Sequence, residues 1–85
     1  MPYYVYIIQS LIDGTYYVGS TQNVDERVTR HNQRRSKYTK GRGPWELVYT
    51  EEFADRASAM KREKEIKSRK KKEYIDTLLR TSRQI

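Results

Sequence analysis

The chain has 85 residues, a length that allows one domain with one thin hydrophobic core. It contains no cysteine and one histidine, which excludes a disulfide framework and argues against a zinc site built from thiolates or imidazoles. The formal net charge is +7, and the chain has neither a membrane-spanning apolar run of roughly 20 residues nor an export signal, so we expect a cytoplasmic protein that binds a polyanion and no membrane.

The first two elements are predicted to be strands joined by a hairpin. Residues 3–9 and 15–20 are rich in β-branched and aromatic side chains. Asp13-Gly14 between them is a strong signal for a two-residue turn. Such a turn puts even-numbered residues of the first strand on the same face as odd-numbered residues of the second, so Tyr6 lies beside Tyr17. A loop one residue longer would reverse this arrangement.

A helix is predicted directly after the hairpin. Asn23 is a suitable N-cap, Glu26 is its capping-box partner three residues later, and Asp25 falls in the positive first turn. We expect this helix to run to about residue 34. The face that meets the sheet carries a stripe of Val24, Arg27, Val28 and His31.

A polar, basic loop over residues 36–44 leads to a third strand at residues 45–53. Asp55 is a plausible N-cap for the next helix, and Glu63 falls within its apolar stripe of Ala59, Met60 and Ile66. A carboxylate on an inward face costs free energy unless it is paired or binds a cation. Glu63 is therefore a candidate for an ion pair or for a metal ligand.

The last helix is expected over about residues 71–80, followed by a frayed tail at residues 81–85. Residues 1–85 then form a single domain with its core at about residues 3–80. The order strand, strand, helix, strand, helix, helix predicts an α+β fold with a small three-stranded antiparallel sheet flanked by about three helices.

Basic residues are concentrated in two segments, residues 27–42 and 61–72. Such clusters indicate a nucleic-acid partner, although a solubilising surface has the same composition. The candidate nucleic-acid contacts are Arg30, Arg34, Arg35, Lys37, Lys40, Arg42, Lys61, Lys64 and Lys67.

Four features in order make the chain similar to a known family. They are Tyr4-Val5-Tyr6, then Tyr17-Val18-Gly19, then Arg27 eight residues after that glycine, then Glu63 on a predicted helix. This pattern resembles the GIY-YIG nuclease superfamily over about residues 3–70. The closer likeness is to its small, uncharacterised, stand-alone bacterial single-domain members, through residues 19–23, 43–45 and 59–63.

The resemblance implies a divalent-metal-dependent endonuclease that cuts DNA. Glu63 would bind one Mg²⁺ or Mn²⁺, weakly because a single carboxylate is a sparse site. Tyr17 would activate the attacking water, Tyr6 would hydrogen-bond the phosphate or the water, and Arg27 would stabilise charge on the phosphate. His31 would assist proton transfer. For these roles we expect the side chains to converge on one face of the sheet.

The sequence departs from the family pattern at two positions and in one larger respect. Tyr4 replaces the glycine of the first motif, and Ser20 stands where DNA-repair members often carry a basic residue. We expect no separate DNA-binding domain, so the resemblance implies low intrinsic specificity. Two alternatives stay open: a non-catalytic nucleic-acid-binding module, and a nuclease subunit whose specificity comes from a protein partner. We expect a monomer. A structural ion pair of Glu63 with Arg27 or Lys67 is the alternative to its role as a metal ligand.

Overall fold

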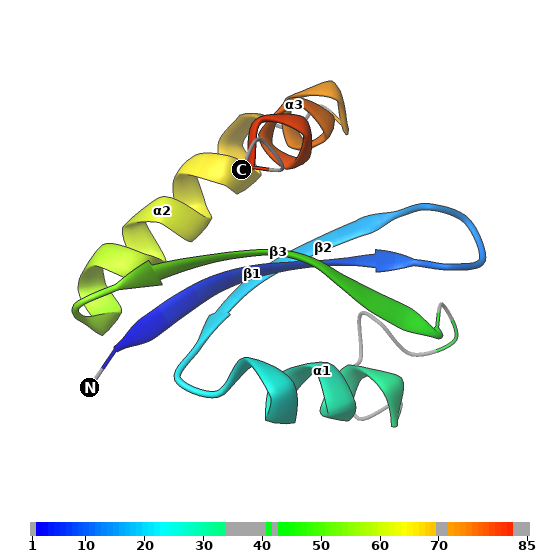
Figure 1. The fold of residues 1–85 in the computed structure, drawn as a ribbon, viewed down its shortest axis with the longest axis horizontal. Helices are drawn as coiled ribbons and strands as arrows, with labels where there is room; N and C mark the ends of the chain where they lie inside the picture. Colours follow the sequence, from blue (N-terminus) through cyan, green and yellow to red (C-terminus); the bar gives the residue numbers. More distant parts are fainter. Residues whose placement is uncertain (1, 34–40, 42, 70–71, 83–85) are drawn as a thin grey trace.

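The computed structural model describes residues 2–33, 41, 43–69 and 72–82. The elements follow the predicted order (Figure 1). They are β1 (Tyr3–Ser10), β2 (Tyr16–Thr21), α1 (Val24–Asn32), β3 (Trp45–Phe53), α2 (Arg56–Arg69) and α3 (Lys72–Ser82). The three strands form one antiparallel sheet in the order β2-β1-β3, which confirms the predicted fold class.

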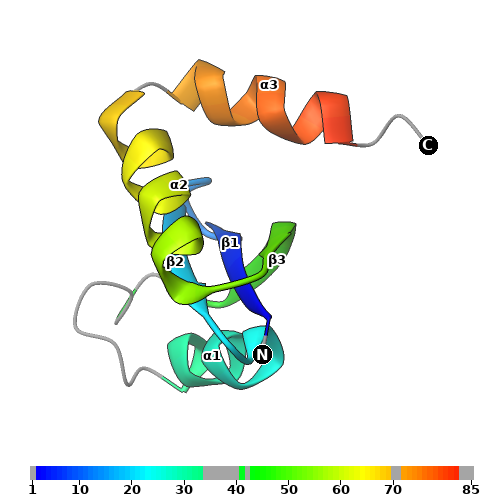
Figure 2. The same cartoon turned by 90° about the vertical axis from the view of Figure 1, so that its left-hand side faces the viewer.

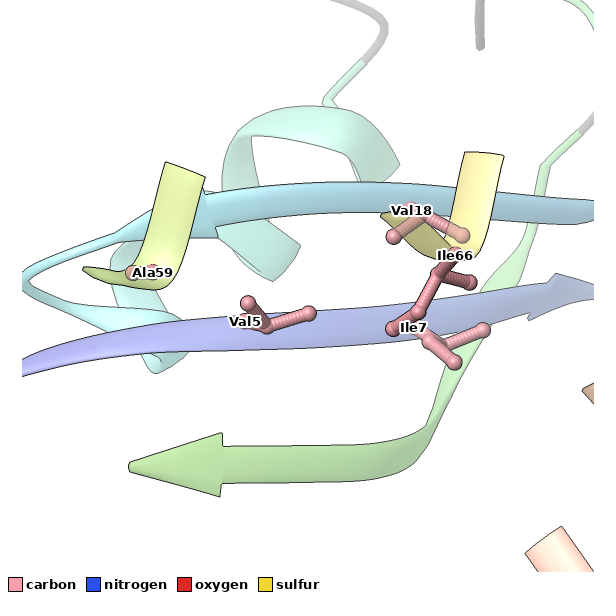
Figure 3. Packing of buried hydrophobic residues seen from close by; sticks show 5 residues of the cluster. All are labelled: Val5, Ile7, Val18, Ala59 and Ile66. Atoms are coloured by element: carbon pink, nitrogen blue, oxygen red, sulfur yellow. The ribbon is translucent and has the colours of Figure 1, made fainter. Parts of the chain in front are cut away.

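The sheet lies between two helical layers. Helix α1 covers one face, and α2 with α3 lies on the other (Figures 1 and 2). The alternation of side chains along the central strand β1 supplies both cores. Val5 and Ile7 point toward α2 (Figure 3), whereas Tyr6 and Ile8 pack with Trp45 on the α1 side.

The β1–β2 connection is longer than the predicted two-residue turn. Tyr6 pairs with Gly19, and the backbone N–H of Ser10 donates to the carbonyl of Thr15 at 2.8 Å, so residues 11–14 form a four-residue loop. The Ser10 hydroxyl accepts from the backbone N–H groups of Ile12 and Asp13, and Gly14 adopts a positive φ of 77°. Because the loop is two residues longer, the predicted faces are kept: Tyr6 and Tyr17 share the α1 side.

Both predicted N-caps are present. The side-chain oxygen of Asn23 accepts from the N–H of Glu26 at 3.0 Å, and Asp55 accepts from the N–H of Ser58 at 2.8 Å. In the expected capping box, the Glu26 side chain would accept from the backbone N–H of Asn23. That N–H instead donates to the Thr21 hydroxyl at 3.2 Å. Helix α1 ends at Asn32, earlier than the predicted residue 34, which lies outside the described residues.

Two expectations for the C-terminal helices need correction. Ala59 and Ile66 are buried as predicted, but Met60 is 47 % exposed, because it sits about 100° around the helix from Ala59. Helix α3 continues through Ser82 instead of fraying from residue 81; residues 71 and 83–85 lie outside the described part. In the part of the chain that the structure describes, no helix is long and apolar enough to cross a membrane.

Ile66 and Met60 provide a direct test of this core. Ile66 is 2 % exposed and packs with Val5, Ile7 and Val18, so we expect Ile66→Ala to lower the free energy of unfolding by about 2–5 kcal/mol. Met60→Ala, on the same helix, should cost less than about 1 kcal/mol. Urea denaturation followed by circular dichroism measures both, and equal losses would contradict this packing.

Candidate active site

Tyr6 and Gly19 face each other across the β1–β2 pair, and the tyrosine ring lies directly over the glycine. A Cβ added at Gly19 would stand 2.6 Å from the Tyr6 hydroxyl oxygen and 2.7 Å from the ring carbon that carries it. Real Cβ atoms essentially never approach that closely, so a side chain at position 19 would displace the ring. Glycine here serves to let the Tyr6 hydroxyl reach across β2 toward helix α1.

That hydroxyl meets His31. The Tyr6 oxygen lies 2.9 Å from Nε2 of His31, and both side chains are buried, at 1 % and 3 % exposure. The Tyr17 ring completes the cluster, with its centroid 4.8 Å from His31 and 6.4 Å from Tyr6. Three of the five predicted catalytic residues are thus in mutual contact on the α1 side of the sheet.

Arg27 lies one helical turn before His31 and belongs to the same cluster. Its guanidinium lies near the Tyr6 hydroxyl and acts to lower the pKa of that group. Its Nε is buried and has no hydrogen-bond partner among the described residues. Buried donors without partners are uncommon in native proteins, and each one calls for a strained or functional explanation. The Arg27 side chain is therefore held by packing and by Tyr6, with donor capacity left over.

Burial sets the protonation of the two innermost groups. Burial, followed by the charge of Tyr17, raises the pKa of Tyr6 above its ordinary value of 10.0, although Arg27 opposes this shift. Burial, followed by Arg27 and Arg30, lowers the pKa of His31 below 6.5. Tyr6 is therefore a neutral phenol and His31 a neutral imidazole at pH 7.

Glu63 lies on the other side of the sheet from this cluster. It lies on α2, so the expectation that all the side chains converge on one face was wrong. One carboxylate oxygen accepts from the Ser20 hydroxyl at 2.7 Å, and the other accepts from the Lys67 ammonium at 2.6 Å. Ser20 alternates with Gly19 and therefore faces α2. Sequence reasoning missed its contact with Glu63, because strand alternation shows only that Ser20 faces away from Tyr17.

The two sides meet because β2 is an edge strand of the described sheet. The Lys67 ammonium, while paired with Glu63, lies 5.8 Å from the centroid of the Tyr17 ring. The charge of Glu63 also contributes to raising the pKa of Tyr6. A requirement that Glu63 and Tyr17 share a face was therefore too strict, because groups on opposite faces can approach each other around an open edge.

Among the described residues, the predicted nucleic-acid contacts are divided between the two sides of the sheet. Arg30 is exposed on α1, whereas Lys61 and Lys64 are exposed on α2, across the sheet. Lys67 is partly exposed but engaged with Glu63. The remaining predicted contacts lie outside the described residues: Arg34, Arg35, Lys37, Lys40 and Arg42.

The donor set at Glu63 suits a divalent cation of the kind that keeps most of its water. The described residues hold no group of three or more His, Cys, Asp or Glu side chains that could enclose a metal ion. Glu63 nevertheless presents a carboxylate that already attracts a cation, the Lys67 ammonium. Mg²⁺ is commonly held by one or two carboxylates plus water and phosphate oxygens. The site fits such an ion provided that the Lys67 ammonium moves away from the Glu63 carboxylate.

Comparison with known proteins identifies the class. A family model described as the GIY-YIG catalytic domain matches residues 2–76. This chain belongs to the GIY-YIG family. The resemblance inferred from Tyr4-Val5-Tyr6, Tyr17-Val18-Gly19, Arg27 and Glu63 is thereby confirmed.

Relatives within that family include UPF0213 proteins. One from Natronomonas pharaonis is 51% identical over 76 residues, which cover 86% of this chain and 88% of the relative. One from Halalkalibacterium halodurans is 44% identical over 81 residues, covering 92% of this chain and 85% of the relative. The solution NMR structure of a UPF0213 protein from Bacillus halodurans is similar with a TM-score of 0.55 at 43% identity, covering 92% of this chain and 85% of that one.

The buried histidine predicts a pH dependence of stability. The pKa of His31 is lower in the folded protein than its ordinary value of 6.5, so below that pH the unfolded chain binds a proton that the folded chain excludes. This contribution to stability is complete above 6.5 and is lost as the pH falls toward the folded pKa. We expect His31→Gln to flatten the fall in urea midpoint between pH 8 and pH 5. An unchanged fall would show that other groups cause it.

Proposed function

We propose that this protein is a divalent-metal-dependent endonuclease that hydrolyses phosphodiester bonds in DNA with low intrinsic sequence specificity. The observation that carries the proposal is Lys67, which pairs with Glu63 on α2 and lies 5.8 Å from the centre of the Tyr17 ring, and so links Glu63 to the side of the sheet that holds Tyr17 and Arg27, at the β2 edge of the described sheet. A guanidinium, a phenol and a carboxylate around one accessible edge are suited to a phosphate that passes along it. Membership of the GIY-YIG family supports the same conclusion.

Burial divides the five candidate residues into two groups. Tyr17, Arg27 and Glu63 are each partly exposed, so they are the side chains that touch substrate. Tyr6 and His31 are buried, and the Tyr6 hydroxyl is hydrogen-bonded to His31 and lies near Arg27. We therefore assign Tyr6 and His31 to positioning: Tyr6 orients the guanidinium, and His31 fixes the Tyr6 hydroxyl. This differs from the direct phosphate contact that the family resemblance implied for Tyr6.

In the proposed reaction a water molecule attacks the phosphorus and the bond to the leaving oxygen breaks. Tyr17 accepts a hydrogen bond from the attacking water and so orients it; the proton of that water passes to solvent, and the leaving oxygen takes a proton from solvent. Arg27 donates hydrogen bonds to the non-bridging oxygens, where negative charge accumulates, and its forked geometry matches two of them. Its orientation is set before substrate arrives, so little reorganisation is needed during the reaction. Glu63 holds the Mg²⁺ or Mn²⁺, which supplies charge neutralisation at the phosphate and increases the acidity of water.

Substitution of the partly exposed residues Tyr17, Arg27 and Glu63 should reduce cleavage without unfolding the protein. We expect Glu63→Gln, Arg27→Ala and Tyr17→Phe each to slow metal-dependent cleavage by about 10²–10³, the cost of losing one preorganised charge-stabilising group. Labelled single-stranded, duplex and branched DNA, each with Mg²⁺, Mn²⁺ or chelator, provide the substrates.

Neighbouring residues of the same type provide matched controls for these variants. Glu65→Gln, on the exposed side of α2, should leave the rate unchanged. Arg30→Ala, on α1, should weaken binding without changing the rate at saturating DNA. If the control variants lose as much cleavage as Glu63→Gln and Arg27→Ala, the assignment of the site is wrong.

Lys67 provides a test of the metal site that does not depend on activity. Its ammonium competes for the Glu63 oxygen, and an exposed helical pair of this kind contributes about 0.2–1 kcal/mol. We therefore expect Lys67→Met to tighten Mn²⁺ binding by about two- to fivefold, measured by electron paramagnetic resonance of free Mn²⁺. Lys64→Met removes the same charge elsewhere on α2 and should have no comparable effect. Weaker binding in Lys67→Met would contradict the competition.

The Lys67–Glu63 ion pair also favours a second candidate function. If the ammonium permanently neutralises the carboxylate, the domain is a nucleic-acid-binding module without turnover. The two functions differ in one measurement: a module binds DNA equally well with and without metal, and cuts it in neither condition. A partner-dependent subunit would instead gain cleavage when its partner protein is supplied.

A further inference from the structure

A groove of about 720 Å³ extends from the candidate active site along the other side of the hairpin. Its walls are the loop end and β2 on one side, and the end of α2 with the start of α3 on the other. Tyr17 and Lys67 belong both to this groove and to the candidate active site. The groove therefore opens directly beside the position where Glu63 is paired.

The groove combines an apolar wall with two cations and an aromatic ring. Val18, Ile66 and Ile75 contribute the apolar part. Lys67 and Lys72 contribute ammonium groups, and Asp13 is the acidic residue that lines it. The Asp13 carboxylate is used locally, since it accepts from the backbone N–H of Thr15 at 2.9 Å.

Tyr16 provides a fixed ring in this groove. Its hydroxyl donates to the carboxylate of Asp76 on α3 at 2.6 Å, which ties β2 to the helix and holds the ring in place. The Lys72 ammonium lies 5.9 Å from the centre of the same ring. Lys72 also passes near the loop: a Cβ at Gly14 would be 3.6 Å from its nitrogen. A ring with a cation beside it is a preformed place for a flat group that carries negative charge.

We propose that this groove is a subsite for one unpaired nucleotide next to the phosphate that is cut, so that the substrate is a single strand or a strand separated from its complement. The base lies against Tyr16 and the apolar wall, and Lys72 with Lys67 receives the phosphates on either side. The proposal rests on the proposed function for its position beside the reaction, although binding can be measured without cleavage.

Size and chemistry favour a nucleotide over other anions. The volume falls within the roughly 300–1,000 Å³ typical of sites that enclose one small organic molecule, which suits a nucleotide and is far too small for a duplex. Proteins that bind single strands combine a cationic groove with aromatic side chains on which bases stack. An acidic peptide would use the lysines but has less need for a fixed ring beside an apolar wall.

The groove also suggests a second use for Lys67. When a phosphate enters, the Lys67 ammonium has an alternative anion and can leave the Glu63 carboxylate. Binding of the strand and exposure of Glu63 are then linked through one side chain. This linkage is consistent with a metal site that is completed only when substrate is present.

The test compares two anions of equal charge in chelator, so that cleavage plays no part. A fluorescent octamer of thymidine nucleotides is titrated by anisotropy against wild type, alongside the same sugar–phosphate chain without bases. We expect the thymidine octamer to bind about tenfold more tightly. Tyr16→Leu should weaken its binding by about tenfold, which lies within the range for loss of one stacked base, and should abolish the preference over the abasic chain.

Lys72→Gln should weaken binding of both chains and reduce the salt slope of the thymidine octamer by about 0.7, as expected for one phosphate contact to a single strand. Arg80→Gln removes the same charge further along α3, about 12 Å away, and should change affinity by less than twofold. Tyr16→Phe keeps the ring and should retain the base preference even if loss of the Asp76 bond reduces stability.

Amide chemical shifts locate the binding site in the wild-type protein, so this measurement does not depend on the folding of any variant. In wild type, the thymidine octamer should shift the N–H signals of Thr15, Val18 and Lys72. Shifts restricted to α1, or equal affinity of wild type for the two chains, would overturn the subsite. So would displacement of the octamer by an oligoglutamate peptide of equal charge at equal concentration. Absence of cleavage, in contrast, would count against the proposed nuclease and leave this binding result intact.

Discussion

The contact between the Tyr6 ring and Gly19 is the constraint on which the rest of the site depends. The ring can cross β2 only because position 19 has no side chain, and a Cβ there would come within 2.6 Å of the hydroxyl. By crossing, Tyr6 places a neutral hydroxyl between His31 and Arg27 on α1. The helix is thereby joined to the central strand by polar contacts as well as by Val24 and Val28. Without that space the guanidinium would lose this neighbour.

The site as a whole is assembled around an edge instead of on a face. Helices α1 and α2 lie on opposite sides of a three-stranded sheet (Figure 2), and β2 is the edge strand around which Lys67 of α2 lies near the Tyr17 ring. Ser20 and Gly19, adjacent in sequence, point in opposite directions and serve the two sides: Ser20 holds Glu63, and Gly19 admits Tyr6. The basic residues are divided in the same way between α1 and α2. A small domain thus builds a polar centre without opening either of its cores.

Periodicity predicted most of the fold, because strand alternation and helix caps are local properties. The limits of the third strand and the caps at Asn23 and Asp55 follow from a few neighbouring residues. The hairpin loop was predicted too short because the Ser10 hydroxyl, and not Asp13-Gly14 alone, organises the turn. The face from which Glu63 approaches could not be predicted, since it depends on how α2 crosses the sheet. The burial of Tyr6 and His31 is likewise a tertiary property, and it changes the roles that fit them.

The open edge of β2 also constrains how this molecule can associate with others. Edge strands present unpaired backbone groups on which another extended chain can add. In this sheet, an added strand would run beside Ser20 and between Tyr17 and Glu63, covering the place where both helices deliver their polar groups. Pairing of β2 with a strand of another molecule and binding of the proposed nucleic-acid substrate at this edge are therefore mutually exclusive. Lys67, which bridges Glu63 and the Tyr17 ring across that edge, is a charged side chain of the kind that discourages such pairing.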